Sequence, residues 1–154
     1  MTFNIGDLGY YATHKDDIDA LLNICDSVIC NLDEAKELFG QEDDILTLAH
    51  RMSEKFLFGA ITDGRNGAIV FHNKIMVAIP AIHIEPYAIV DTNGAGDHFS
   101  AGFIYGLMNG YKLTQAGRLG VLCSTDCIGH AGARPIGGYG SLKHLAEDVR
   151  NVSA

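Results

Sequence analysis

Short apolar segments alternate with amphipathic helices along this chain, and the alternation constrains the fold more than any other feature. Strand-like segments cover residues 3–5, 28–30, 56–62, 68–72, 75–80 and 87–90. Helices are expected over residues 16–25, 31–39, 45–55, 95–109, 113–130 and 141–151. Strands that alternate with helices are typical of an α/β domain with a largely parallel sheet, so we expect that architecture.

Charge and hydropathy exclude several classes of protein. The 154 residues include 11 basic and 19 acidic side chains, a formal net charge of −8 that argues against binding to nucleic-acid phosphates. No apolar run approaches the roughly 18 residues that a membrane span needs. The first residues, MTFNIGDLGYY, lack the basic and apolar regions of a signal peptide. We therefore expect neither nucleic acid nor a membrane as a partner.

The four cysteines, at positions 25, 30, 123 and 127, form no CxxC pair. Without a secretory context, this pattern favours a reduced chain in the cytoplasm. Cys123 and Cys127 lie four residues apart on an expected helix. We interpret them as thiols of the core, because a metal-binding pair would need His or carboxylate ligands in matching register.

Residues 91–97, with the sequence DTNGAGD, connect an expected strand to an expected helix. Gly94 and Gly96 allow the backbone to approach a ligand closely. The free N–H groups of the first helical turn, together with the helix dipole, form an anion site for which phosphate is the obvious ligand. Asp97 lies at the same helix start, where its carboxylate could accept a proton from an attacking hydroxyl group. The adjacent N–H groups could stabilise the charge on a transferring phosphoryl group.

The same segment also allows two simpler interpretations. Asp97 could be only an acid at a helix start, with Gly94 and Gly96 forming only a turn. A dinucleotide-binding loop is the other alternative, but Gly102 follows Gly96 by six residues rather than three, so the GxGxxG pattern is missing. A Walker loop is excluded because no GKS or GKT tripeptide occurs in the sequence.

Three segments, taken in order along the chain, resemble the ribokinase-like (PfkB) carbohydrate and nucleoside kinases. Residues 90–110, VDTNGAGDHFSAGFIYGLMNG, resemble the C-terminal signature of that family. Residues 31–35, NLDEA, resemble its NxxE motif, and residues 61–68, ITDGRNGA, resemble its T-x-G-x-x-G nucleotide-binding turn. Asn93 and residues 130–135, HAGARP, are similar to the adenosine-kinase-like branch.

The resemblance implies a ribokinase-like three-layer α/β/α sandwich, of which this chain covers only the C-terminal half. Residues 1–154 would form a single partial domain without the N-terminal half and the β lid. Hydrophobic residues make up 47% of the chain and charged residues 19%, against roughly 25% charged in ordinary domains. This apolar excess fits a surface that faces another half, so we expect the chain to form a homo-oligomer or to bind a complementing N-terminal half.

The resemblance further implies ATP-dependent phosphoryl transfer to a sugar or nucleoside hydroxyl group. In that reaction Asp97 would be the general base for the acceptor hydroxyl. Gly94, Ala95 and Gly96 would supply the anion hole. The implied cofactors are ATP and Mg²⁺, with K⁺ as a further candidate.

Asn31 and Glu34 would hold phosphate and the water bound to Mg²⁺, because Mg²⁺ keeps several waters and needs few protein ligands. Their structural alternative is a helix cap, in which Asn31 caps the helix and Glu34 completes a capping box; the two roles are compatible. The other residues expected at the nucleotide are Thr62, Gly64, Gly67 and His130.

Asp91 and Asn93 lie where relatives bind a monovalent cation. Asp91 has a second interpretation, which we favour, as a brace that accepts N–H groups of the loop. His98 is interpreted as a partly exposed helix residue that could tune Asp97. For His130, a packed position at a helix end is the alternative to the adenine site.

The sequence leaves three alternative functions for this chain. The first is a phosphotransferase with Asp97 as base. The second is a nucleotide-binding half-module, or an inactive remnant, that needs a separate N-terminal half. A dinucleotide-dependent oxidoreductase is the third, and the missing third glycine disfavours it.

Overall fold

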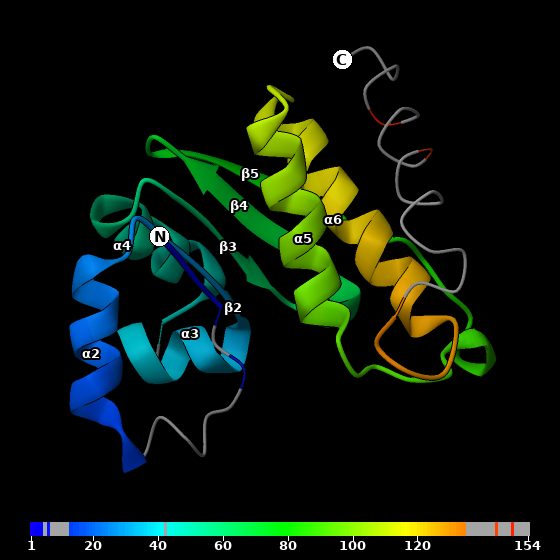
Figure 1. Cartoon of the computed structure of the whole chain (residues 1–154), viewed down its shortest axis with the longest axis horizontal. Coiled ribbons are helices and arrows are strands. Elements are labelled where there is room, and N and C mark those ends of the chain that lie inside the picture. The colour runs from blue at the N-terminus through cyan, green and yellow to red at the C-terminus, as the bar shows by residue number, and fades with distance from the viewer. Residues whose placement is uncertain (5, 7–12, 42, 135–143, 145–148, 150–154) are drawn as a thin grey trace. The chain divides into compact units, whose positions relative to one another are not determined.

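The computed structural model of the chain describes residues 1–4, 6, 13–41, 43–134, 144 and 149 (Figure 1). Its contacts divide the chain into two compact units. Unit 1 contains Met1–Gly64 and Ala68–Ala78, and unit 2 contains Arg65–Gly67 and Ile79–Ala154. Among the described residues, none of the helices is both long and apolar enough to cross a membrane.

One sheet of five strands runs in sequence order, β1-β2-β3-β4-β5. The strands are β1 Thr2–Asn4, β2 Ser27–Asn31, β3 Phe58–Thr62, β4 Ala68–His72 and β5 Ile75–Ile79. β1 pairs with β2 and β2 with β3 in parallel, whereas β3 and β4 are antiparallel. The sheet is therefore mixed: the parallel arrangement predicted from the sequence holds for β1 to β3.

A tight hairpin joins β4 to β5, as the sequence predicts. Asn73 and Lys74 form its turn with φ angles of 50° and 66°. Positive φ at both central residues is the mark of the turn type whose twist matches that of paired strands, and asparagine tolerates it better than most residues. Such a two-residue connection can join only antiparallel strands.

Three helices of unit 1 connect or follow its parallel strands: α2 Lys15–Ile24, α3 Leu32–Phe39 and α4 Ile45–Lys55. Each starts or ends close to its predicted boundary, and α4 has the predicted bounds. Asp44 caps α4, where its Oδ1 accepts the Thr47 N–H at 2.7 Å. Asp44 is the last of three consecutive acidic residues before the helix, and the first of them, Glu42, lies outside the described residues.

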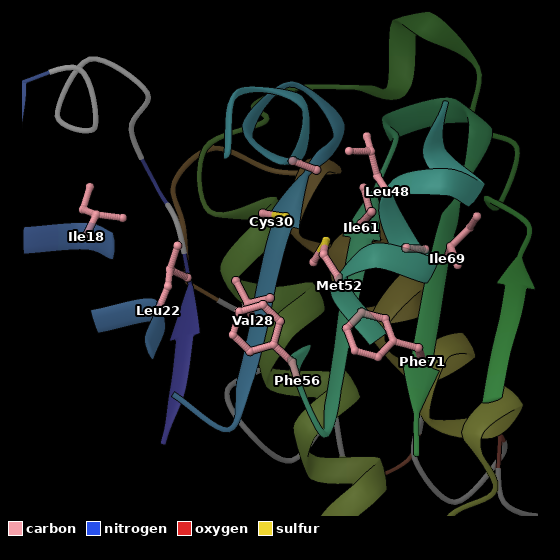
Figure 2. Close-up of a cluster of buried hydrophobic side chains, with 12 residues drawn as sticks. Ile18, Leu22, Val28, Cys30, Leu48, Met52, Phe56, Ile61, Ile69 and Phe71 are labelled. Atoms are coloured by element: carbon pink, nitrogen blue, oxygen red, sulfur yellow. The ribbon is translucent and has the colours of Figure 1, made fainter. Parts of the chain in front are cut away.

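The core of unit 1 lies between one face of the sheet and these helices. Figure 2 shows Val28, Ile61 and Phe71 of the strands facing Leu48 and Met52 of α4. All five side chains are fully buried. The alternation of side chains along each strand directs these residues to one face, and the apolar stripe of α4 covers them.

Unit 2 is built on two helices that lie side by side, α5 Ala95–Met108 and α6 Leu113–Ile128 (Figure 1). They approach closely because a glycine faces the contact. A Cβ atom on Gly102 would lie only 2.8 Å from the Leu119 carbonyl oxygen and 2.8 Å from the Cys123 Sγ. Cys123 and Cys127 are buried free thiols, which confirms their interpretation as core residues.

The strand predicted for residues 87–90 is wrong. The chain there forms a short 3₁₀ helix, η2 Pro86–Ala88, followed by an extended segment. Pro86 occupies the start of this helix, where its missing N–H group is of no consequence and its fixed φ suits a helical turn. Val90 instead donates its backbone N–H to the Ile128 carbonyl at 2.8 Å, so its hydrogen bond goes to the end of α6 rather than to a strand.

Two smaller differences concern chain segments at the ends of elements. Phe56 was predicted to begin a strand, but it caps the C-terminal end of α4 and β3 begins at Phe58. The glycine-rich segment between the helices expected over residues 113–130 and 141–151 is described only as far as residue 134. Most of the helix predicted for residues 141–151 lies outside the described residues.

Candidate active site

The DTNGAGD segment begins α5 in unit 2, as predicted. Gly94 is the N-cap of this helix, and the His98 backbone N–H donates to the Gly94 carbonyl at 2.9 Å. The first turn contains Ala95, Gly96 and Asp97, whose backbone N–H groups point toward the start of the helix, where the Ala95 N–H donates to the Thr92 carbonyl at 3.3 Å. Gly96 and Asp97 are exposed, and a Cβ atom on Gly96 would meet no atom within 4 Å. The backbone at this helix start is therefore open to a ligand.

Position 94 requires glycine for two reasons. Its φ is 80°, a left-handed conformation that residues with a Cβ atom rarely adopt. A Cβ atom there would also lie 2.5 Å from the Cβ of Ala133. The loop thus packs closely against the chain that follows α6.

Asp91 braces the loop, which confirms the interpretation that we favoured from the sequence. Its Oδ1 accepts the Asn93 backbone N–H at 3.0 Å, and its Oδ2 accepts the Gly132 backbone N–H at 3.0 Å. These two hydrogen bonds lower the pKa of the Asp91 carboxyl below its ordinary value. The carboxylate joins two segments that are far apart in sequence, and its role as a ligand for a monovalent cation, with Asn93, stays a prediction.

Two further side chains hold the loop, and the sequence did not predict these contacts. The His98 Nδ1 lies 3.0 Å from the Gly94 carbonyl oxygen, so this nitrogen donates. The Cys127 Sγ donates to the Asn93 carbonyl at 3.5 Å. Burial, with Asp91 nearby, raises the pKa of the Cys127 thiol, which keeps its proton available for this contact. The only sequence signal for the thiol was its position on the apolar face of α6.

The NxxE residues form a capping box at the start of α3 in unit 1. The Asn31 Oδ1 accepts the Glu34 backbone N–H at 2.9 Å, and the Glu34 Oε2 accepts the Asn31 backbone N–H at 2.8 Å. This confirms the helix-cap interpretation. Thr62 is the register partner of Asn31 in β3, so Asn31, Glu34 and Thr62 lie at the carboxyl ends of two parallel strands. In open α/β sheets, that end of the strands is where ligands bind.

Glu34 is buried although it is ionisable. Its exposed fraction is 5%, and burial raises the pKa of its carboxyl above the ordinary value. Mg²⁺ is commonly held by one or two carboxylates and keeps several waters, so one buried carboxylate fits a hydrated Mg²⁺ ion. Among the described residues, no group of three or more His, Cys, Asp or Glu side chains is placed to bind a metal directly.

Replacing Glu34 with Gln is expected to make the free energy of unfolding less dependent on pH. Because the pKa of Glu34 is raised on folding, the folded chain binds this proton more tightly than the unfolded chain. Wild-type stability should therefore fall as the pH rises from the ordinary carboxyl pKa through the raised one. Glutamine keeps a carbonyl oxygen for the Asn31 N–H but adds no buried charge.

Urea unfolding at a series of pH values between about 4 and 7 would measure this slope. Glu37→Gln is the matched control, because Glu37 is exposed on the same helix. If Glu34→Gln loses stability with rising pH as steeply as the wild type does, the Glu34 carboxyl is not the source of the slope.

The remaining predicted nucleotide residues occupy a turn and a helix end. Gly64 belongs to a 3₁₀ turn, η1 Gly64–Asn66, and is exposed, whereas Gly67 is buried. His130 follows α6 and is half-buried, as expected of a packed histidine at a helix end. Within the described part of the chain, its Nε2 is buried without a hydrogen-bond partner. The contacts of these residues with a nucleotide stay predictions.

The sequence of this chain is similar to those of known kinases. The pfkB family carbohydrate kinase domain matches residues 3–136. An uncharacterized sugar kinase of Archaeoglobus fulgidus is 32% identical over 119 residues, which are 77% of this chain and 46% of the relative. This chain therefore spans less than half of that relative's length.

Solved structures of kinases share the fold. A probable sugar kinase of Rhizobium etli aligns with a TM-score of 0.82 at 31% identity, over 96% of this chain and 44% of that protein. The adenosine kinase of Sinorhizobium meliloti aligns with a TM-score of 0.81 at 26% identity, over 99% of this chain and 44% of that protein. These matches confirm the ribokinase-like α/β fold. Because both sugar and adenosine kinases match, assignment to the adenosine-kinase-like branch stays a prediction.

Proposed function

The chain belongs to the pfkB family of carbohydrate kinases, and from this membership we propose that it carries the phosphate-binding and catalytic-base part of an ATP-dependent phosphotransferase. The acceptor would be a hydroxyl group of a sugar or a nucleoside. The observation that carries the proposal is the start of α5, where an exposed Asp97 follows an open glycine backbone.

Each residue at this helix start has a defined part in the proposed reaction. Asp97 accepts the proton of the attacking hydroxyl group as that oxygen bonds to the γ-phosphorus of ATP, while the bond from the γ-phosphorus to the β–γ bridging oxygen breaks and ADP leaves. The backbone N–H groups of residues 94–96 stabilise the negative charge on the transferring phosphoryl oxygens. They need no rearrangement during the reaction, because Gly94 packs against Ala133 and the Asp91 carboxylate holds the loop.

Residues at and after the carboxyl ends of β2 and β3 would bind the nucleotide and its Mg²⁺ ion. Glu34 and Asn31 would hold water bound to Mg²⁺, and Thr62, Gly64 and Gly67 would shape the turn beside the phosphates. When it is bound, Mg²⁺ neutralises charge on the β- and γ-phosphates. The raised pKa of the buried Glu34 supports a functional role, since perturbed carboxyl groups are enriched at functional sites.

A second candidate is a nucleotide-binding half-module that needs a complementing N-terminal half. It is favoured by the coverage of the matches, because this chain aligns with only 44–46% of the length of the relatives named above. In the sheet, β1 is an edge strand that could accept a strand from a partner. Association with such a half, or with a second copy of the chain, is part of this candidate.

A phosphorylation assay would separate the two candidates. ATP-dependent transfer to ribose-type sugars and to adenosine would be measured with the chain alone and with an N-terminal half from a related kinase added in trans. We expect ATP with Mg²⁺ to raise the melting temperature of the chain, because a ligand that binds only the folded state stabilises it. ATP stabilisation with turnover only in trans would favour the half-module. The absence of any response to nucleotides would contradict both candidates.

A further inference from the structure

We propose that Asn93 is a site of spontaneous deamidation, and that the reaction inactivates the phosphate-binding loop with age. Asparagine followed by glycine is the dipeptide in which this reaction meets least steric hindrance, because glycine has no side chain to shield its nitrogen. Asn93-Gly94 is such a dipeptide, and it lies at the start of α5. The effect on ATP binding rests on the proposed function, whereas the modification itself does not.

The chemistry needs only water. The backbone nitrogen of Gly94 attacks the side-chain Cγ of Asn93, an N–C bond forms, and the Cγ–Nδ2 bond breaks. Ammonia leaves with the proton that the Gly94 nitrogen loses, which produces a five-membered succinimide ring. Water then opens the ring at one of its two carbonyl carbons. One product has aspartate at position 93, and the other has isoaspartate, in which the main chain runs through the former side chain.

The local structure leaves both reacting groups available. Asn93 is exposed. Within the described residues, neither its side-chain amide nor the Gly94 backbone nitrogen makes a hydrogen bond. Asn93 and Gly94 are the central residues of a turn closed by the Ala95 N–H and the Thr92 carbonyl at 3.3 Å. The peptide between two central residues takes no part in such a closing bond.

The sequence contains two further Asn-Gly dipeptides, Asn66-Gly67 and Asn109-Gly110, and the second of them supplies an internal comparison. Asn109-Gly110 is also exposed, and Gly110 has a positive φ of 74°. Its reacting groups are held, however. The Asn109 Nδ2 donates to the Tyr105 carbonyl at 2.8 Å, and the Gly110 N–H donates to the Leu107 carbonyl at 3.1 Å. The same chemistry at Asn109 therefore requires two hydrogen bonds to open first.

Both products would disturb the loop. Either one adds a carboxylate next to the first turn of α5, where a phosphate would otherwise be the anion that the helix start attracts. Isoaspartate also lengthens the main chain by one atom. That change displaces the Asn93 N–H from Asp91 and the Asn93 carbonyl from Cys127, which are contacts that hold the loop in place.

The test is to age the folded chain in mildly alkaline buffer and to quantify deamidation at each Asn-Gly dipeptide by peptide mass spectrometry. Isoaspartate would be measured separately by enzymatic methylation. We expect Asn93 to convert at least about tenfold faster than Asn109, the factor associated with opening two ordinary hydrogen bonds. Equal rates at the two positions, or no conversion at Asn93, would overturn the proposal.

Unfolding provides the structural control. In concentrated urea the Asn93-Gly94 and Asn109-Gly110 dipeptides both lose their surroundings, so Asn93 and Asn109 should convert at similar rates. A preference for Asn93 that persists in urea would show that local sequence causes it, and would overturn the structural argument. Asn93→Gln keeps an amide but moves its carbon one bond further from the Gly94 nitrogen, and it should abolish conversion at position 93.

The effect of deamidation on ATP binding is measured by the rise in melting temperature that ATP produces. Aged wild-type chain should lose this rise in proportion to conversion at Asn93, whereas aged Asn93→Gln should keep the response of its fresh sample. An undiminished response in fully converted wild type would overturn inactivation by deamidation. Fresh chain that does not respond to ATP would contradict the proposed function, and peptide mapping would then decide the modification independently.

Discussion

Asp97→Asn is expected to lower the rate of phosphoryl transfer by about 10²- to 10⁴-fold, the usual contribution of a general base. Asparagine has nearly the same shape as aspartate but cannot accept the proton of the acceptor hydroxyl group. Because the proposed anion site uses backbone N–H groups at the start of α5, the substitution leaves those donors in place. Nucleotide binding should therefore persist while turnover is lost.

The measurement is ATP-dependent transfer, in the preparation that shows turnover, together with the rise in melting temperature caused by ATP. Asp17→Asn is the matched control, because Asp17 is an exposed acid in the first turn of α2 as Asp97 is in α5. If transfer by Asp97→Asn equals that of the wild type, Asp97 is not the base. Loss of the ATP response together with turnover would assign Asp97 to binding instead.

Gly102→Val should destabilise unit 2 by about 1 to 3 kcal/mol, the usual penalty for overpacking a well-packed contact. The first added carbon would already lie 2.8 Å from the Leu119 carbonyl oxygen, and this backbone atom cannot move without shifting α6. The two methyl groups of valine add further volume to the same contact. Since α6 carries Cys127 and precedes Gly132, both of which hold the DTNGAGD loop, the ATP response should weaken as well.

Thermal and urea unfolding would measure the loss of stability. Ala101→Val places the same side chain one position earlier, on the exposed side of α5, and should change stability little. The comparison separates the helix propensity of valine from its steric effect at the contact. Equal stabilities of the two variants would show that α5 and α6 can separate at Gly102 without penalty.

Local elements were predictable where a few neighbouring residues decide the backbone. The capping box of Asn31 and Glu34 and the hairpin turn of Asn73 and Lys74 both depend on side chains within three residues of each other. The prediction for residues 87–90 was wrong because it overlooked the effect of one neighbouring residue and assumed a strand partner. Its apolar residues suit a strand, but Pro86 favours a helical turn, and the strand partner that the pattern presumed is replaced by the end of α6.

In the candidate site, too, local features could be predicted from the sequence and long-range contacts could not. The helix start, its glycines and Asp97 could be located from the sequence, because an open helix terminus and a following carboxylate are local features. The sequence also suggested Asp91 as a brace of the loop, but it could not locate the loop's contacts with distant segments. The Asp91 carboxylate meets Gly132, and Cys127 meets Asn93, only after α5 and α6 have packed together and returned the chain to the loop.

Sequence alone was therefore enough to establish the kinase-like motifs, the α/β class and the position of the proposed base. Short-range backbone preferences and hydrogen bonds decide such features, and they act before the chain is fully folded. Tertiary packing decided that Asp91 also holds Gly132, that Glu34 is a buried carboxyl with a raised pKa, and that Asn93 is open while Asn109 is held. Burial and hydrogen bonding between distant segments depend on the path of the whole chain, which no pattern of neighbouring residues contains.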